Sequence, residues 1–153
     1  MTKKSLLFIW VFLACLGFAN LAHAEEQTVA IIKPDAVRAH HIGEIITVYE
    51  KNGFQIKAIK TVQLTTDKAK AFYVEHKDKP FYPSLVEFMT SGPVIVMVLE
   101  GDNAVAKNRE LMEKTIRKEF GTSKQENAIH GSDSANSAQR EIPFFFTSEE
   151  IVK

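Results

Sequence analysis

The sequence predicts one α+β domain, a ferredoxin-like split βαβ sandwich with a four-stranded antiparallel sheet and helices on one face. Hydrophobic residues alternate or form short runs in some segments and recur every three or four residues in others, as in strands and helices respectively. The predicted order is strand, helix, strand, helical insertion, strand, helix, strand, helix, which is typical of that fold. The composition, 45% hydrophobic and 25% charged, is that of an ordinary globular domain.

The first two elements are a buried strand and an amphipathic helix. Residues 28–32 are a short apolar run rich in β-branched side chains, and Pro34 ends the strand because proline cannot donate to a ladder. This strand delivers Lys33 to an edge. A helix follows, with Asn52-Gly53 as its C-terminal stop and an apolar stripe at Ile42, Ile45, Ile46 and Tyr49.

A second strand and a helical insertion come next. Apolar residues at alternate positions from Phe54 to Leu64 predict a half-buried strand. Thr66 and Asp67 are N-cap candidates for a helix. The apolar positions of this helix and of a second short one are Ala69, Phe72, Tyr73 and His76, then Leu85, Phe88 and Met89.

The last four elements begin after the break at Gly92-Pro93. Residues 94–99 are six consecutive apolar residues, which predicts a central strand. Asn103 is a candidate cap for a helix that runs through Leu111 and Met112. Ala128-Ile129 is a candidate edge strand, and residues 132–134 are suited to cap the final helix.

Residues 1–24 read as a secretory signal peptide. Two lysines precede the apolar run 6–16, and Ala22-His23-Ala24 is an A-x-A cleavage site. The alternative is an uncleaved signal anchor, which would give the only predicted membrane contact. Cleavage after Ala24 would leave residues 25–153 as the mature domain. An exported protein, periplasmic or secreted, is therefore expected, with the cytoplasm as the alternative.

Charge and cysteine content exclude several classes of function. The chain has 19 basic and 19 acidic residues, so bulk charge gives no reason to predict nucleic-acid binding. Its single cysteine, Cys15, excludes an intramolecular disulfide and a thiolate zinc site.

The most distinctive segment is 127–134, Asn-Ala-Ile-His-Gly-Ser-Asp-Ser, in which a histidine and a glycine precede a predicted helix start. Glycine permits close approach, and a helix N-terminus favours negative charge. His130 could therefore attack phosphorus as the neutral imidazole. The alternative is a structural histidine followed by an ordinary cap.

Residues 28–146 resemble the nucleoside diphosphate kinase family in several collinear blocks. These are residues 31–37 (Ile-Ile-Lys-Pro-Asp-Ala-Val), 79–81 (Lys-Pro-Phe), 85–89 (Leu-Val-Glu-Phe-Met), 91–94 (Ser-Gly-Pro-Val) and 127–134. The resemblance implies the fold above, assembled as a hexamer or tetramer. It also implies ping-pong transfer of the γ-phosphate from ATP or another nucleoside triphosphate to a nucleoside diphosphate.

The resemblance also implies roles for individual residues. His130 is the expected phosphohistidine, Glu141 orients its ring, and Ser132, Tyr73 and Lys33 complete the catalytic set. The alternatives are that Glu141 is an ordinary carboxylate on a helix face, Ser132 an N-cap and Tyr73 a core residue. The expected nucleotide-binding residues are Lys33, Arg109, Thr115 and Arg117 for the phosphates, Phe81 for base stacking and Asn127 for the ribose. Mg²⁺ is the expected cofactor, held mainly by phosphate oxygens and water rather than by a protein cage.

One segment departs from the family pattern. Between Met112 and Ile116 the chain is shorter by about nine residues, a large change for a connection in a compact domain. Thr115 can match a threonine at either end of the missing loop. Two further functions therefore stay open: an exported nucleotide-binding protein without catalysis, and a slow histidine phosphocarrier acting on proteins.

Overall fold

The computed structural model describes residues 25–153, so the predicted leader lies outside the described residues. Along the described chain the elements are β1 (Glu26–Ile32), α1 (Pro34–Arg38), α2 (Ile42–Lys51), β2 (Gln55–Val62), α3 (Thr66–Phe72), η1 (Val74–His76), α4 (Tyr82–Met89), β3 (Val94–Gly101), α5 (Ala104–Leu111), η2 (Met112–Ile116), α6 (Arg117–Phe120), β4 (Ile129–Gly131), α7 (Ala135–Phe145) and η3 (Ser148–Glu150). None of these helices has the length and apolarity needed to cross a membrane.

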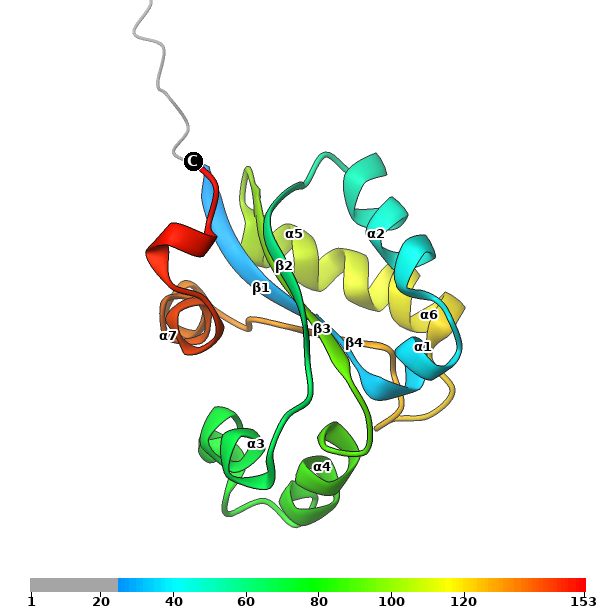
Figure 1. The fold of residues 1–153 in the computed structure, drawn as a ribbon. Coiled ribbons are helices and arrows are strands. Elements are labelled where there is room, and N and C mark those ends of the chain that lie inside the picture. The colour runs from blue at the N-terminus through cyan, green and yellow to red at the C-terminus, as the bar shows by residue number, and fades with distance from the viewer. Residues whose placement is uncertain (1–24) are drawn as a thin grey trace, which may run out of the picture.

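The four strands form one sheet in the order β2-β3-β1-β4, and every neighbouring pair is antiparallel. This confirms the predicted fold class (Figure 1). The apolar run predicted as a central strand is β3, which lies between β1 and β2. The short strand β4 lies at one edge, where Ile31 of β1 pairs with His130.

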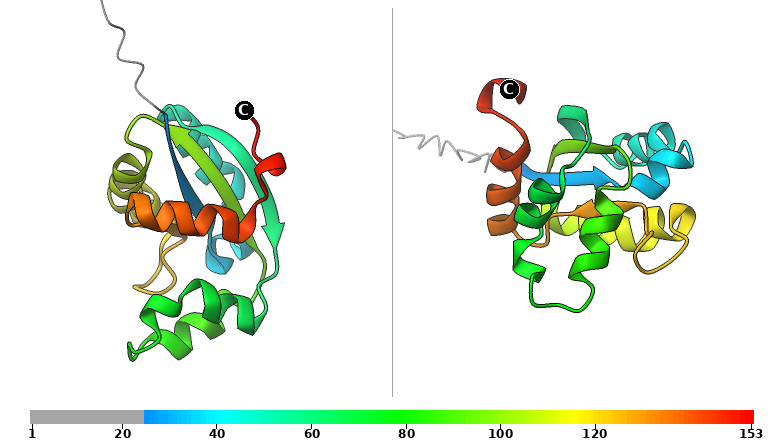
Figure 2. Two further views of the ribbon diagram at one scale, coloured as in Figure 1. Left: turned by 90° about the vertical axis from the view of Figure 1, so that its left-hand side faces the viewer. Right: turned by 60° about the horizontal axis from the view of Figure 1, so that its bottom comes forward.

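Helices cover both faces of the sheet, so the expectation of helices on one face was wrong. Alternate residues of β1 enter two separate cores: Val29 and Ile31 pack with α3, α4 and α7, whereas Ala30 and Ile32 pack with α2 and α5. Figure 2 shows the two layers on either side of the strands. The six consecutive apolar residues of β3 reflect this double burial, because a one-sided strand would alternate.

Local details of two helix starts also differ from the sequence prediction. The cap of α3 is Thr65, whose side chain accepts from the Lys68 N–H, rather than Thr66 or Asp67. The helix α1 was not predicted, and it begins at Pro34, a favoured first helical residue because its missing N–H would be unpaired there. At α7 the cap lies within the predicted group, because Ser134 accepts from the Ser137 N–H.

The shortened segment is helical throughout. α5, η2 and α6 follow one another without a break, and η2 is a π-helical turn in the middle. A π turn has a wider repeat than an α-helix, and such turns occur mostly as local bulges inside α-helices. The segment is therefore closed by a helix with a changed register instead of by a loop.

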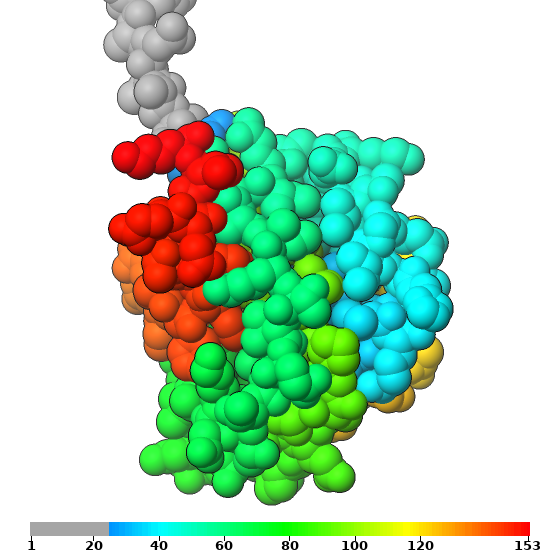
Figure 3. Space-filling view, viewed as in Figure 1, coloured from blue at the N-terminus to red at the C-terminus, as the bar shows by residue number. Residues whose placement is uncertain are grey.

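The C-terminal end covers the other sheet edge. The Val152 N–H donates to the Lys57 carbonyl of β2 at 3.0 Å, and Lys60 pairs with Glu150 at 2.8 Å. Figure 3 shows the C-terminal residues lying against β2. This cover shields the unpaired backbone groups of an edge strand, which would otherwise be open to association.

Candidate active site

His130 lies in the middle of edge strand β4, next to β1 and close to α5. Its side chain is 20% exposed, so one side of the ring is accessible. The following residue must be small, because a Cβ at Gly131 would collide with Met112 and with the Asn108 side chain. The glycine thus lets the helix that contains α5 and η2 pack directly behind the histidine.

A buried carboxylate and a hydroxyl hold the histidine ring. His130 Nε2 lies 3.2 Å from Glu141 Oε1, and the Ser132 hydroxyl donates to Glu141 Oε2 at 2.5 Å. The Val29 N–H of β1 donates to the same hydroxyl at 3.2 Å. The Glu141 side chain is only 5% exposed. The structure therefore brings together three of the predicted site residues: His130 of β4, Ser132 directly after β4, and Glu141 of α7.

This network fixes the tautomer of the histidine. An ionised carboxylate can only accept hydrogen bonds, so the proton of the neutral ring lies on Nε2. The lone pair is then on Nδ1, which makes no hydrogen bond within residues 25–153. The arrangement is suited to nucleophilic attack by Nδ1.

Two aromatic rings pack edge-on against His130. The ring centroid of Phe72 lies at 5.2 Å and that of Tyr73 at 5.8 Å. The Tyr73 hydroxyl is buried without a hydrogen-bond partner in the described part of the chain. Burial raises the pKa of Tyr73 far above its usual value, and the charge of Glu141 adds to this shift, so the hydroxyl stays a proton donor.

Lys33 and Asn127 are in direct contact. Lys33 Nζ donates to Asn127 Oδ1 at 2.7 Å and to the Gln125 carbonyl at 3.5 Å. Burial lowers the pKa of Lys33, and with the nearby positive charge of Arg117 adding to this effect the pKa falls to about 8. A buried ammonium with few partners is a good anion receptor, because a bound anion restores the solvation that it has lost.

Asp35 has a role to which sequence reasoning gave no weight. Its carboxylate accepts from the Ala128 N–H at 3.0 Å, and the Ala128 carbonyl accepts from the Lys33 N–H at 2.8 Å. Ala128 has φ 72°, a strained value for a residue with a Cβ. These two bonds hold the strained residue and so fix the backbone on which Asn127 and His130 lie. Asp35 lies within residues 31–37, one of the blocks that resemble the family, and this membership could have identified it.

Both predicted arginines lie near the histidine. Arg117 bonds the Ile129 carbonyl at 3.3 Å through Nη2 and pairs with Glu113 through Nη1. Arg109 is exposed on α5. The Ser137 hydroxyl lowers the pKa of Asp133, and the positive charge of Arg109 lowers it further, which places Arg109 within electrostatic reach of that carboxylate.

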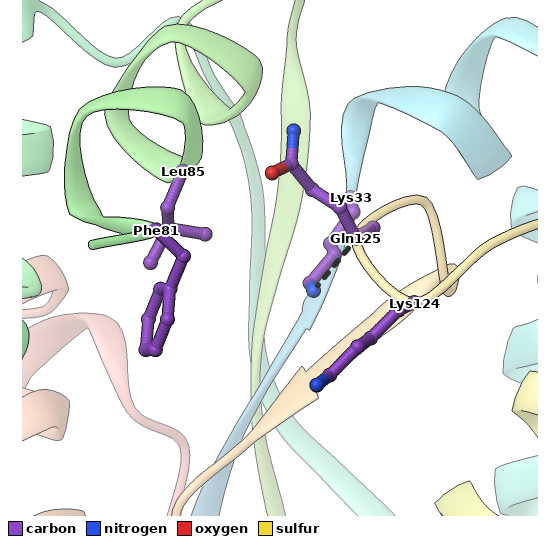
Figure 4. Close-up of a pocket in the computed structure, with 5 residues that line it drawn as sticks. All are labelled: Lys33, Phe81, Leu85, Lys124 and Gln125. Atoms are coloured by element: carbon purple, nitrogen blue, oxygen red, sulfur yellow. Dashed lines mark hydrogen bonds between the residues drawn. The ribbon is translucent and has the colours of Figure 1, made fainter. Parts of the chain in front are cut away.

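A cavity of about 310 Å³ lies beside these residues. Phe81 and Leu85 line one side, and Lys33, Lys124 and Gln125 line the other (Figure 4). Phe81 is 48% exposed, and its ring also lies 5.7 Å from that of His76 between centroids, so part of the aromatic surface stays open to the cavity. Thr115 is not part of this group: it lines a separate depression with Asn52 and Lys107. Sequence reasoning did not identify Lys124, Gln125 or Leu85 as cavity residues.

The described residues offer no ready-made metal cage. Among residues 25–153, no three histidine or acidic side chains come close enough together to hold an ion. The cations Lys33 and Arg117 instead mark a site for an anionic ligand. Such a site is compatible with a metal ion that arrives bound to phosphate oxygens and keeps several waters.

Curated relatives align with nearly the whole described chain. Nucleoside diphosphate kinase 1 of Protochlamydia amoebophila is 56% identical over 137 positions, which cover 84% of this chain and 97% of that protein. The nucleoside diphosphate kinase of Chlamydia felis is 54% identical and covers 83% and 96%. Because 84% of 153 residues is about 129, about eight of the 137 aligned positions have no counterpart here. Over the aligned stretch the chain is therefore shorter than the Protochlamydia protein by about eight residues.

Solved structures and a family model agree with these relatives. The nucleoside diphosphate kinase of Aquifex aeolicus superposes with a TM-score of 0.79 at 45% identity, covering 84% of this chain and all of that one. A halophilic enzyme of the same name from Halobacterium salinarum, solved with CDP, gives 0.81 at 38% identity, covering 84% and 92%. The model of the family described as nucleoside diphosphate kinase matches residues 26–151. The chain belongs to the nucleoside diphosphate kinase family.

Proposed function

We propose that this protein transfers the γ-phosphate of a nucleoside triphosphate to a nucleoside diphosphate through a phosphohistidine at His130. Nδ1 attacks the γ-phosphorus, and the N–P bond forms as the bond from phosphorus to the β,γ-bridging oxygen breaks. The electron pair leaves with the nucleoside diphosphate. In the second half-reaction a terminal β-phosphate oxygen of another nucleoside diphosphate attacks the same phosphorus and returns the lone pair to Nδ1.

The observation that carries the proposal is the Ser132–Glu141–His130 network. It aims a carboxylate at one ring nitrogen and leaves the other nitrogen as the free nucleophile. The carboxylate also stabilises the positive charge that the ring gains when it is phosphorylated. A purely structural histidine has no need of a buried carboxylate partner, since burying a carboxylate is costly.

The other residues are proposed to bind the nucleotide. Arg117 lies close enough to lower the pKa of Lys33, and together the two cations can neutralise the phosphates during transfer. Asn127 exchanges its bond to Lys33 for the ribose hydroxyls. Phe81 stacks on the base, an interaction available to every base. Arg109 adds a positive charge near the His130 end of the site.

Mg²⁺ is proposed to enter with the nucleotide. Ligands from phosphate oxygen and water satisfy its octahedral preference without a protein cage, in keeping with the cationic lining of the site. When bound, the ion supplies charge neutralisation on the phosphates. Lys33 and Arg117 would neutralise phosphate charge beside the ion.

The proposal is tested with residues 25–153 incubated with Mg²⁺ and γ-labelled ATP and then chased with dTDP. We expect acid-labile label on the protein that moves to the acceptor. A folded, ADP-binding protein that takes up no label would indicate the non-catalytic alternative, and label that stays on the protein would indicate the phosphocarrier alternative. The non-catalytic alternative is not favoured, since relatives up to 56% identical are nucleoside diphosphate kinases.

The ion pair between Glu113 and Arg117 yields a prediction about the shortened segment. Glu113 is mostly exposed, so the pair contributes at most about 1 kcal/mol and phosphate can displace it. Glu113→Ala removes this competitor and is expected to lower the KM for ATP by about two- to fivefold with little change in kcat. Steady-state kinetics measure both constants.

Glu110→Ala is the matched control, because Glu110 pairs with Lys114 at the same i,i+4 spacing one turn earlier. We expect its KM to equal that of the unmodified protein. A KM that is unchanged in Glu113→Ala as well would show that Arg117 does not bind the phosphates.

The lowered pKa of Lys33 predicts a pH dependence of nucleotide binding. The protonated ammonium binds the phosphates, so affinity is greatest below pH 8 and is lost as the pH rises through the pKa of about 8. The KM for ATP should rise up to about tenfold between pH 7 and pH 9, following the protonated fraction. Lys33→Arg stays charged and should remove this rise. The same rise in Lys33→Arg would assign the titration to another group.

Export and assembly are also proposed. We infer that residues 1–24 direct export and are removed after Ala24, which N-terminal sequencing of the protein from periplasmic and culture fractions tests. An intact N-terminus in the cytoplasmic fraction would contradict this. A hexamer or tetramer is proposed from the family, and light scattering of residues 25–153 measures it.

A further inference from the structure

Lys124 forms part of the wall of the nucleotide cavity and faces Phe81. Phe81 lies at the start of α4 on one side of the cavity, and Lys124 lies in the connection between α6 and β4 on the other. In Figure 4 the Lys124 side chain extends into the space toward the Phe81 side. A base stacked on Phe81 would therefore lie within the region that this side chain can reach.

The backbone around Lys124 is held in place. The Lys124 carbonyl accepts from the side-chain amide of Asn127 at 3.1 Å, and the Gln125 side-chain amide donates to the Ser84 carbonyl of α4 at 3.4 Å. The next residue, Glu126, pairs with Arg38 at 3.5 Å. These contacts tie the connection to both sides of the cavity, so the position of the Lys124 backbone relative to Phe81 is defined.

The ammonium group of Lys124, by contrast, is available to bind a ligand. It makes no hydrogen bond or ion pair with any residue in the 25–153 range. The other lysine of the cavity, Lys33, is bonded to Asn127 and lies next to Arg117, toward the phosphate end. The two lysines of the cavity therefore differ: Lys33 is engaged with Asn127, whereas the ammonium group of Lys124 is free to meet a ligand.

An ammonium group discriminates between bases because it has three donors and no acceptor. Guanine and hypoxanthine present a carbonyl oxygen at C6, and uracil and thymine present one at C4, whereas adenine and cytosine present an amino group there. A lysine can donate to the carbonyl oxygen and finds only another donor at the amino group. Lysine contacts to guanine O6 and N7 are among the commonest specific contacts to a base.

We propose that Lys124 makes this site prefer nucleotides whose base carries the carbonyl oxygen over those that carry the amino group. The inference rests on the proposed function and specifies its substrate class, the 6-oxopurine and 4-oxopyrimidine nucleoside diphosphates. Because the lysine is exposed and water competes for its protons, the preference is expected to be about three- to tenfold in kcat/KM.

The test uses acceptor pairs that differ at this group. Protein of residues 25–153 is first phosphorylated and then mixed, in separate reactions, with IDP, ADP, UDP or CDP. The rate at which the label leaves the protein gives a second-order rate constant for each acceptor. We expect the IDP/ADP and UDP/CDP ratios to be about three to ten. In Lys124→Met, which keeps the length and apolar stem, both ratios should fall to about one.

Lys118→Met is the control, since Lys118 is an exposed lysine on α6 outside the cavity, and its ratios should equal those of the unmodified protein. Ratios near one before mutation, or an equal loss for all four acceptors in Lys124→Met, would overturn the inference while leaving the transferase function intact. A protein that takes up no phosphate would instead refute the proposed function. The base preference is then still decided by equilibrium binding of IDP and ADP to both proteins.

Discussion

Replacing His130 by alanine is expected to lower kcat for transfer from ATP to dTDP by more than about 10⁴-fold, because the variant has lost the atom that forms the N–P bond. Acid-labile label on the protein should disappear completely. The fold should survive, since His130 is partly exposed on an edge strand and its neighbours Phe72 and Tyr73 are anchored elsewhere in the core. Thermal unfolding and ADP binding measured beside the kinetics establish this.

The matched control is His41→Ala. His41 lies before α2, where it pairs with Glu44 at 2.7 Å, and it has no part in the cavity. Its activity should be unchanged. Transferable label on folded His130→Ala protein would mean that another side chain carries the phosphate, and the proposed mechanism would have to be abandoned.

The sequence was sufficient to predict elements that depend on a hydrophobic pattern or a capping rule within a few adjacent residues. The strand at residues 94–99, the helix stop at Asn52-Gly53 and the serine cap before α7 each follow from residues adjacent in the chain. The resemblance to a family added what such rules cannot supply, namely the pairing of His130 with Glu141. These two residues are 11 positions apart, and only the packing of α7 beside β4 brings them together.

Other features depend on contacts that no local pattern encodes. The second helical layer follows from burial of β1 on both faces, which a five-residue apolar run suggests but does not assign to particular helices. The bond from Asp35 to Ala128 spans 93 positions. The helical course of residues 112–116 was not predicted either, because a shortened loop can close in many ways, and here a π turn closes it.

The second large effect is expected for Glu141→Gln, which keeps the shape of the side chain and removes its charge. The amide has one acceptor and one donor end, whereas the carboxylate of Glu141 accepts at both oxygens, from Ser132 and from His130. Either Ser132 or His130 must therefore change from hydrogen-bond donor to acceptor. The other hydrogen bonds of the network determine which of the two changes.

Ser132 is the less able to change. Its oxygen already accepts from the Val29 N–H, and its proton has no other acceptor in the described network, so a donor amide facing it would leave that proton unpaired in a buried site. The amide oxygen should then face Ser132 and the NH₂ group should face His130 Nε2. This makes Nε2 an acceptor and moves the ring proton to Nδ1.

A proton on Nδ1 occupies the lone pair needed for attack, so kcat should fall by up to about 10⁴-fold, the loss that a wrong histidine tautomer causes in a catalytic triad. Formation of the phosphohistidine should slow equally, while the KM for ATP changes little. NMR of ¹⁵N-labelled histidine should place the proton on Nε2 in the unmodified protein and on Nδ1 in Glu141→Gln. In Ser132→Ala the carboxylate remains, so the Nε2 proton should stay and kcat should fall only about tenfold. If Glu141→Gln kept its proton on Nε2 and its activity, the carboxylate would not set the tautomer, and its burial beside His130 would have a structural explanation alone.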